Sequence, residues 1–185
     1  MKLNTFTAKD FIELGNMKSI NKSLERMYKN NEIRRIIAGV YDIPKYSEIL
    51  EEQVAPSISG VAQALARANN WKISPSGISA LNYLALSTQV PAKYTYVSSG
   101  PYKTYSIGNV KLVFKHTNNR LIYDTSEDTT ILIQAIKALG RDNVTDKHQE
   151  IIRKKYDQSK INTILNESKH TTAWIYETIK KIFEV

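Results

Sequence analysis

The chain has 185 residues, with 26 Lys and Arg against 18 Asp and Glu, a net charge of +8 at pH 7 and no cysteine. The absence of cysteine excludes a disulfide framework and a thiolate metal site, and it fits a reducing cytoplasm. No apolar run approaches the ~18 residues of a membrane span, and the N-terminus lacks the apolar core of a signal peptide. We therefore expect a cytoplasmic protein with an anionic partner and no membrane association.

A short helix followed by a tight turn is predicted near the start of the chain. Thr7 suits the N-cap position because Asp10 follows three residues later, and Phe6 can pack against Phe11 across that cap. The pair Gly15-Asn16 tolerates the left-handed backbone that ends a helix. The chain is therefore expected to turn sharply there.

A second helix is predicted over residues 17–29. Apolar side chains recur along it at a period of 3.6 residues and form one buried face, which consists of Met17, Ile20, Leu24, Met27 and Tyr28. The opposite face carries Lys18, Lys22, Glu25 and Lys29, with Ser19 and Arg26 on the shoulder. A helix with lysines in its first turns suits the major groove of DNA, where those turns meet base edges.

A basic β-hairpin is predicted after this helix. Two β-rich runs, 33–37 and 40–43, are separated by Ala38-Gly39, and a two-residue connection is typical of a hairpin. Its basic side chains are Arg34, Arg35 and Lys45. The order of helix, turn, helix and hairpin is that of a winged helix-turn-helix, so residues 1–46 are predicted to bind double-stranded DNA. Basic helix pairs also occur as solvated surfaces and as dimer or docking modules, and that alternative stays open.

An acidic stretch separates this predicted domain from the rest of the chain. Residues 47–56 carry Glu48, Glu51 and Glu52 without a basic residue, and they are predicted to form a linker. Residues 57–185 would then form a second, larger domain of mixed helices and strands.

The tract from Gln53 to Tyr123 contains no Asp or Glu. A solvated surface normally mixes both signs of charge, so this tract predicts a second positive face that meets phosphate or an acidic protein, although chance and burial also produce such tracts. The candidate residues of this face are Lys93, Lys103, Lys111, Lys115 and Arg120.

Helices and strands alternate in the first half of the second domain. An amphipathic helix is predicted over 57–69. Ser74 and Pro75 suit the N-cap and the first turn of a further helix. Between residues 93 and 117 the period changes to two, which indicates three strands in an antiparallel meander.

The last third of the chain is predicted to be helical. One helix starts at Thr125 and ends at Gly140, another starts at Thr145, and the last covers about 171–183 with Trp174 buried against its neighbours. The predicted fold class is therefore α+β, with a winged helix-turn-helix, an antiparallel meander and C-terminal helices.

The sequence carries no local motif of an enzyme. Its seven glycines do not stand in the spacing of a phosphate-binding loop, and no G-x-S-x-G elbow is present. His116, His148 and His170 are dispersed and lack the i, i+4 pairing of a helical zinc site. We therefore expect no enzymatic activity, no metal and no cofactor, while an active site assembled from distant residues would leave no such motif.

Three segments resemble the AbiEi family of antitoxins from type IV toxin-antitoxin systems. They read FTAKDFIELGNMKSINKSLERMYKNNEIRRIIAGVYDIPKYS, VAQALARANNWKISPSGISALNYLALSTQVPAKYTYVSSGP and VKLVFKHTNNR. The resemblance covers roughly residues 4–140 and is most specific in GVYDIP followed by SPSGISALNYLALSTQVP. Members of the family resemble one another in an N-terminal winged helix-turn-helix that represses their operon at inverted repeats.

The resemblance implies a function and a set of contact residues. The C-terminal domain of such antitoxins counteracts a co-encoded nucleotidyltransferase-like toxin, often in phage defence. The residues expected in the DNA groove are Lys18, Ser19, Asn21, Lys22 and Arg26, and those on the wing are Arg34, Arg35 and Tyr41. An alternative is a protein-interaction module that neutralises the toxin by direct contact with little DNA binding of its own.

The predicted domain departs from the usual winged-helix pattern at its start. Winged-helix domains usually have a helix before the pair, and residues 1–5 are too few to form it. Either the domain starts late in this form, or a partner chain or the second domain covers the surface that this helix would pack against. Because inverted repeats match two-fold proteins, a homodimer or cooperative binding of two copies is also expected.

Overall fold

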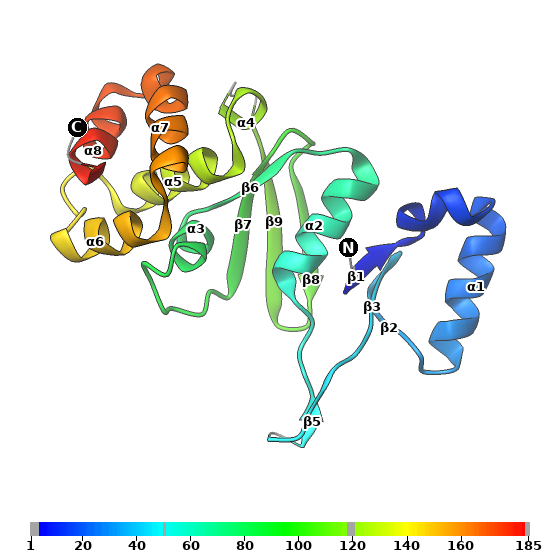
Figure 1. Cartoon of the computed structure of the whole chain (residues 1–185). Coiled ribbons are helices and arrows are strands. Elements are labelled where there is room, and N and C mark those ends of the chain that lie inside the picture. Colours follow the sequence, from blue (N-terminus) through cyan, green and yellow to red (C-terminus); the bar gives the residue numbers. More distant parts are fainter. Residues whose placement is uncertain (1–3, 50, 118–120, 184–185) are drawn as a thin grey trace. The chain divides into compact units, whose positions relative to one another are not determined.

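The protein is described by a computed structural model that covers residues 4–49, 51–117 and 121–183 (Figure 1). It is a mixed α+β protein with several small sheets and a set of helices toward the C-terminus, which confirms the predicted fold class at that level. Its contacts divide the chain into two units, residues 1–71 and 72–185, which we describe in turn. No helix among the described residues is long and apolar enough to cross a membrane.

The first unit starts with a strand, a short helix and a longer helix. Their bounds are β1 Thr5–Thr7, the 3-10 helix η1 Ala8–Leu14, and α1 Met17–Lys29. The backbone N–H of Thr7 donates to Asp10 Oδ2 at 2.8 Å, as the N-cap pattern predicts. The side chain of Asn16 caps α1 by accepting from the Ser19 N–H at 2.9 Å. The predicted bounds of the second helix are thus confirmed, while the first helix is a 3-10 helix.

The predicted hairpin is also present. It consists of β2 Arg34–Ile37 and β3 Val40–Asp42, which pair antiparallel. Gly39 has φ of +76° in the connecting turn, a left-handed conformation that glycine adopts without steric cost. β1 pairs with the other edge of β3, so β3 is the central strand of a three-stranded sheet.

Four buried side chains form the core of this part of the chain: Phe6, Ile20, Leu24 and Ile33. The Phe6 and Phe11 rings meet edge to face with centroids 5.3 Å apart, so the predicted contact across the cap is confirmed. Tyr28 belongs to the predicted buried face of α1, but 43% of it is exposed. It lies about 80° around the helix from Ile20, at the edge of the apolar stripe.

The rest of the first unit differs from the prediction. The segment predicted as a linker contains a small hairpin, β4 Tyr46–Ser47 with β5 Glu52–Gln53, which we call the β4–β5 arm (Figure 1). It is followed by α2 Ile58–Asn69, which confirms the predicted helix and contacts β1, β3 and η1. The sequence pattern places this helix in the second domain, because amphipathic spacing reveals an apolar face but not the surface it packs against.

The second unit contains a four-stranded sheet. Its strands are β6 Ile73–Ser76, β7 Lys93–Ser98, β8 Lys103–Ile107 and β9 Val110–His116, in the order β6-β7-β9-β8. β9 pairs antiparallel with β8 but parallel with β7, so the predicted antiparallel meander is wrong. The physical reason is burial: Leu112, Val113 and Phe114 are all buried, and consecutive buried residues suit a strand that has a neighbour on each edge and so lies inside the sheet.

The predicted helix start at Ser74 and Pro75 is also wrong. Both residues lie in β6, where Pro75 is paired with Tyr96. β6 is an edge strand, which tolerates a residue without a backbone N–H. The helix begins later, as α3 Ile78–Tyr83.

The last part of the chain is helical, and several of its helices pack on one another or on α3. They are α4 Leu121–Asp124, α5 Glu127–Leu139, α6 Asp146–Lys155, α7 Gln158–Glu167, the 3-10 helix η2 Ser168–His170, and α8 Ala173–Phe183. α6 begins after Thr145 as predicted, whereas α5 is capped by Ser126 in place of Thr125. The sequence pattern does not predict α7. Trp174 is partly buried against the shared apolar cluster, which agrees with its predicted packing role.

Candidate nucleic-acid interface

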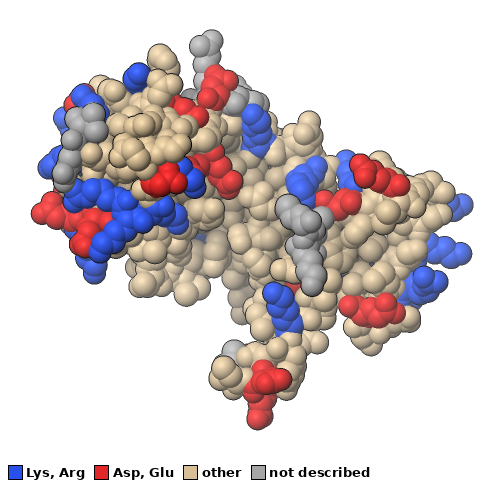
Figure 2. All heavy atoms as spheres, in the orientation of Figure 1, with Lys and Arg blue, Asp and Glu red and all other residues tan. Residues whose placement is uncertain are grey.

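The polar face of α1 carries the candidate DNA-contacting residues. Ile20 and Leu24 turn the opposite face into the core, and this leaves a set of exposed side chains along the helix: Lys18, Ser19, Asn21, Lys22 and Arg26. Among the described residues, no carboxylate forms an ion pair with Lys18, Lys22 or Arg26. Figure 2 shows basic side chains along the outer side of this helix. The predicted helix residues are thus brought together on one open, positively charged surface.

Lys29 differs from these three cations. It forms an ion pair with Glu25 one helical turn earlier, at 2.9 Å. Its hydrogen bond and its charge, together with the charge of Arg35, lower the pKa of Glu25 below its ordinary value. Arg35 on β2 therefore lies near the polar face of α1, so that the hairpin and the helix contribute to the same field.

A shallow hollow on this face is the geometric feature that the sequence does not predict. Its volume is about 510 Å³. The residues that line it are Ser19, Lys22, Ser23, Glu25, Arg26, Lys29 and Asn30. Ser23 and Asn30 add hydrogen-bonding groups beside the cations. Ser23 lies one helical turn after Ser19, and Asn30 lies one turn after Arg26. This spacing is the signal by which the sequence could reveal them.

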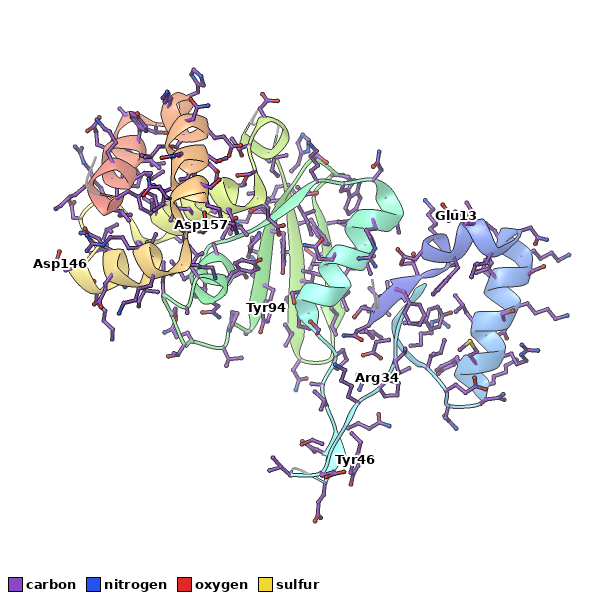
Figure 3. All side chains as sticks on the ribbon, viewed as in Figure 1. Glu13, Arg34, Tyr46, Tyr94, Asp146 and Asp157 are labelled. Carbon is purple, nitrogen blue, oxygen red and sulfur yellow. The ribbon has the colours of Figure 1, made fainter. Side chains whose placement is uncertain are left out.

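Arg34, a predicted wing residue, is held inside the first unit. Its guanidinium donates to the carboxylate of Asp42 across the hairpin, with Nη2 2.6 Å from Oδ2. Nη1 also donates to the backbone oxygen of Val54 at 3.1 Å, at the base of the β4–β5 arm, near which Figure 3 labels Arg34. The hydrogen bonds to Asp42 raise the pKa of Arg34 above its ordinary value. This residue therefore orders the hairpin and the arm.

Of the other residues predicted for the wing, one is packed inside the unit and two are exposed. The ring of Tyr41 is half-buried and stacks on Phe6, with centroids 6.4 Å apart and an angle of 23° between the planes. Arg35 and Lys45 are exposed. Arg35 and Lys45 are thus available to a ligand, while Tyr41 contributes to packing.

An apolar groove runs beside α1 and adjoins the basic hollow, because Ser19 and Ser23 line both. Its volume is about 730 Å³, and its apolar lining includes Phe6, Phe11, Leu14, Ile20, Leu24, Met27, Ile33 and Ile43. Leu14, at the end of η1, is 81% exposed. Within the described residues, the apolar side of the helix pair is therefore incompletely covered.

The second basic set does not form one face. β7 and β9 place Lys93, Lys111 and Lys115 on one side of the sheet, whereas Lys103 on β8 is paired with Phe114 and points to the other side. Arg120 lies outside the residues that the structure describes. The predicted second face is thus reduced to three lysines with a common orientation.

Metal-binding geometry is not found in the described ranges 4–49, 51–117 and 121–183, where no cluster of three His, Asp or Glu side chains is placed to hold an ion. The Nδ1 atom of His116 lies 2.9 Å from the carbonyl oxygen of Gly100, and His148 lies in the first turn of α6. Both histidines have local structural contacts.

The fold and this surface define a mixed α+β protein with a basic helix beside a hairpin in its first unit. The chain belongs to the family described as "Family of unknown function (DUF6088)", which it matches over residues 2–164. None of the curated proteins matches it in sequence. Among solved structures, it is similar to the crystal structure of RV2827C protein from Mycobacterium tuberculosis, with 11% identity and a TM-score of 0.45 over 97% of this chain and 71% of that chain.

Proposed function

We propose that this protein is a cytoplasmic antitoxin of a type IV toxin-antitoxin system, active in phage defence, and that it represses its own operon through a winged helix-turn-helix in its first unit. The observation that carries the proposal is the row of exposed cations on α1, Lys18, Lys22 and Arg26. Further support comes from the order β1, η1, α1 and β2–β3 hairpin, which is the order of a winged helix. The resemblance of the sequence to AbiEi antitoxins supplies the type of system.

In this proposal α1 is the recognition helix. Lys18, Asn21 and Lys22 occupy its first two turns, the part of a recognition helix that meets base edges, and Arg26 follows one turn later. Asn and Arg side chains form bidentate hydrogen bonds with adenine and guanine, and lysines neutralise phosphates. The helix thus carries groups for both sequence readout and positioning.

The hairpin acts as the wing. Arg35 and Lys45 are its exposed cations and contact phosphates, while Arg34 and Tyr41 hold the wing in place through Asp42 and Phe6. An inverted-repeat operator matches two copies of the protein, either as a homodimer or as copies that bind cooperatively. The cognate nucleotidyltransferase-like toxin is the functional partner, and the antitoxin itself is not an enzyme.

The β4–β5 arm favours a second candidate function, direct contact with the toxin. Ile49 is 94% exposed on this arm, beside the carboxylates of Glu48, Glu51 and Glu52. Figure 2 shows acidic side chains on the projecting part where Figure 1 places β5. Such a surface repels DNA and suits a basic protein partner, so it supports neutralisation by contact.

The proposal is tested by separating repression from neutralisation. We expect the double variant Lys22→Ala/Arg26→Ala to lose repression of a reporter placed behind the promoter of its own operon. The same variant is expected to protect cells against the co-expressed toxin as well as the wild type does, because the substituted side chains lie on the DNA-contacting face only.

The matched control is Lys147→Ala/Lys181→Ala, which removes two exposed lysines from α6 and α8 in the second unit. It has the same net charge and is expected to repress normally. Repression that survives in Lys22→Ala/Arg26→Ala would contradict the assignment of α1 as the recognition helix. Loss of repression in both variants would indicate that repression depends on the net charge of the protein and not on a specific surface.

A further inference from the structure

One side of the sheet in the second unit gathers lysines from two strands. In the parallel pair β7–β9, Lys93 lies opposite Lys111, and Val97 lies opposite Lys115. Side chains of paired residues project to the same side of a sheet, and positions 111 and 115 on one strand share a side because the period is two. We call this surface, with Lys93, Lys111 and Lys115, the lysine face.

Hydroxyl groups from the neighbouring strand extend this face. In β8, Ser106 lies opposite Lys111 and Thr104 lies opposite Val113. Both are exposed, as are the three lysines. Because adjacent strands are ~4.8 Å apart, Lys93, Lys111 and Ser106 form a continuous row of donors across three strands.

The charges of the lysine face are not compensated within the part of the chain that the structure describes. Like charges directly opposite one another destabilise a strand pair, and Lys93 and Lys111 are in that arrangement. No Asp or Glu occurs between Gln53 and Tyr123, and none of the described carboxylates forms an ion pair with the three lysines. A surface that conflicts with a local stability rule in this way is typical of a binding site.

We propose that the lysine face binds the phosphodiester backbone of a nucleic acid. Ammonium groups beside hydroxyl donors suit phosphate oxygens, which accept from both. Lys111 and Lys115 are four residues apart, or about 13 Å along β9, a length that spans more than one phosphate of a strand. The face therefore fits a chain of phosphates better than a single anion, and its contacts carry no base specificity.

This inference does not depend on the role of α1 and can be tested without it. The starting protein is the full chain with Lys22→Gln/Arg26→Gln, which removes the principal cations of the proposed recognition helix. The probes are a short duplex DNA of arbitrary sequence and a single-stranded RNA of equal length, each with a fluorescent end label. Fluorescence anisotropy across a salt series gives the dissociation constant and the salt slope for each probe.

In that background, the triple substitution Lys93→Gln/Lys111→Gln/Lys115→Gln is expected to weaken binding about ten-fold. It should also reduce the salt slope by roughly 0.9 for each phosphate that the variant no longer neutralises. The matched control, Lys103→Gln/Lys147→Gln/Lys181→Gln, removes equal charge away from the lysine face and is expected to retain most of the affinity. The corresponding Lys→Arg triple keeps the charges and is expected to bind, which separates loss of charge from loss of fold.

The two probes identify the source of the phosphates. Stronger effects of the triple substitution on the DNA probe indicate duplex DNA as the ligand, and stronger effects on the RNA probe indicate single-stranded RNA. Equal weakening in the triple variant and in its matched control would overturn the proposal. It would also be overturned if the starting protein bound neither probe. The role of α1 is tested separately, by whether the protein prefers operator DNA to a scrambled sequence.

Discussion

Arg67 and Asp10 form an ion pair that joins α2 to η1, with Nε 2.7 Å from Oδ1. Arg67 Nη2 also donates to the backbone oxygen of Thr5, so one guanidinium connects α2 to both β1 and η1. The carboxylate of Asp10 is almost fully buried in this contact. The pair therefore explains why α2 belongs to the unit that carries the proposed DNA-binding elements.

Asp10→Asn is expected to destabilise the first unit by about 1–3 kcal/mol, because it removes a charge-assisted hydrogen bond at a mostly buried site. Burial alone would raise the pKa of Asp10, but hydrogen bonds from Arg67 and Thr7 outweigh it and lower the pKa below the ordinary value of 3.8. A lowered folded-state pKa gives stability that is present above the ordinary value and is lost as the pH falls through the folded-state pKa.

Urea unfolding at neutral pH and near pH 3 measures this contribution. The chain has two tryptophans, Trp71 in the first unit and Trp174 in the second, so Trp174→Phe leaves a fluorescence signal from the first unit alone. The stability lost on acidification should be smaller in Asp10→Asn than in the parent. An equal loss in both proteins would show that this carboxylate does not contribute.

Gly60→Ala is expected to destabilise the first unit, although Ala normally favours a helix over Gly by about 1 kcal/mol. A Cβ atom at position 60 would lie 2.6 Å from Thr5 Oγ1, and the buried, β-branched Thr5 has little freedom to move. Thr5→Ala/Gly60→Ala should recover stability relative to Gly60→Ala, because the clashing oxygen is gone. The same Trp71 fluorescence measures both variants, and a stabilised Gly60→Ala would refute the close approach of α2 to β1.

Glu167→Gln is expected to destabilise the second unit by about 1–2 kcal/mol. The carboxylate accepts from the Ser126 N–H at 2.9 Å and the Ser126 hydroxyl at 2.7 Å, and it also accepts from the Thr129 hydroxyl. Burial favours the protonated acid, but these hydrogen bonds prevail and lower the pKa of Glu167. Its contribution is therefore present near neutral pH and is lost as the pH falls below the ordinary value of 4.5.

The control for this substitution is Glu150→Gln, which removes a carboxylate that is paired with Lys154 on the exposed side of α6. Exposed pairs of this kind contribute little, so its unfolding midpoint should match that of the parent. Both are measured in a Trp71→Phe background, where Trp174 reports on the second unit. A Glu167→Gln midpoint equal to that of Glu150→Gln would exclude a capping role for Glu167.

The sequence predicts well where local signals decide the structure. The apolar period and the Asn16 cap determine the bounds of α1, and the glycine at position 39 marks the hairpin turn. The sequence predicts the structure poorly where it depends on which distant segments pair with one another. The order of β7, β8 and β9 depends on which strand has a neighbour on both edges, and a proline at position 75 suits an edge strand as well as a helix start.

The same division applies to the candidate site. The exposed residues of α1 follow from the helical period, so they could be predicted. The pairing of Arg34 with Asp42 requires the register of β2 with β3, and the separation of Lys103 from the other lysines requires the register of β8 with β9. Sequence position alone places Arg34 with the other DNA-contact candidates and Lys103 with the other candidates of the second basic face.

The central claim is that α1 reads the operator, and its most direct test is binding to DNA from upstream of the operon across a salt series. We predict that the wild type prefers this fragment to a scrambled sequence of equal length. We predict that Lys22→Gln/Arg26→Gln loses that preference and lowers the salt slope by roughly 0.9 for each phosphate left without its cation, while Lys147→Gln/Lys181→Gln behaves as the wild type. An undiminished preference in Lys22→Gln/Arg26→Gln, or no preference in the wild type, would contradict the account.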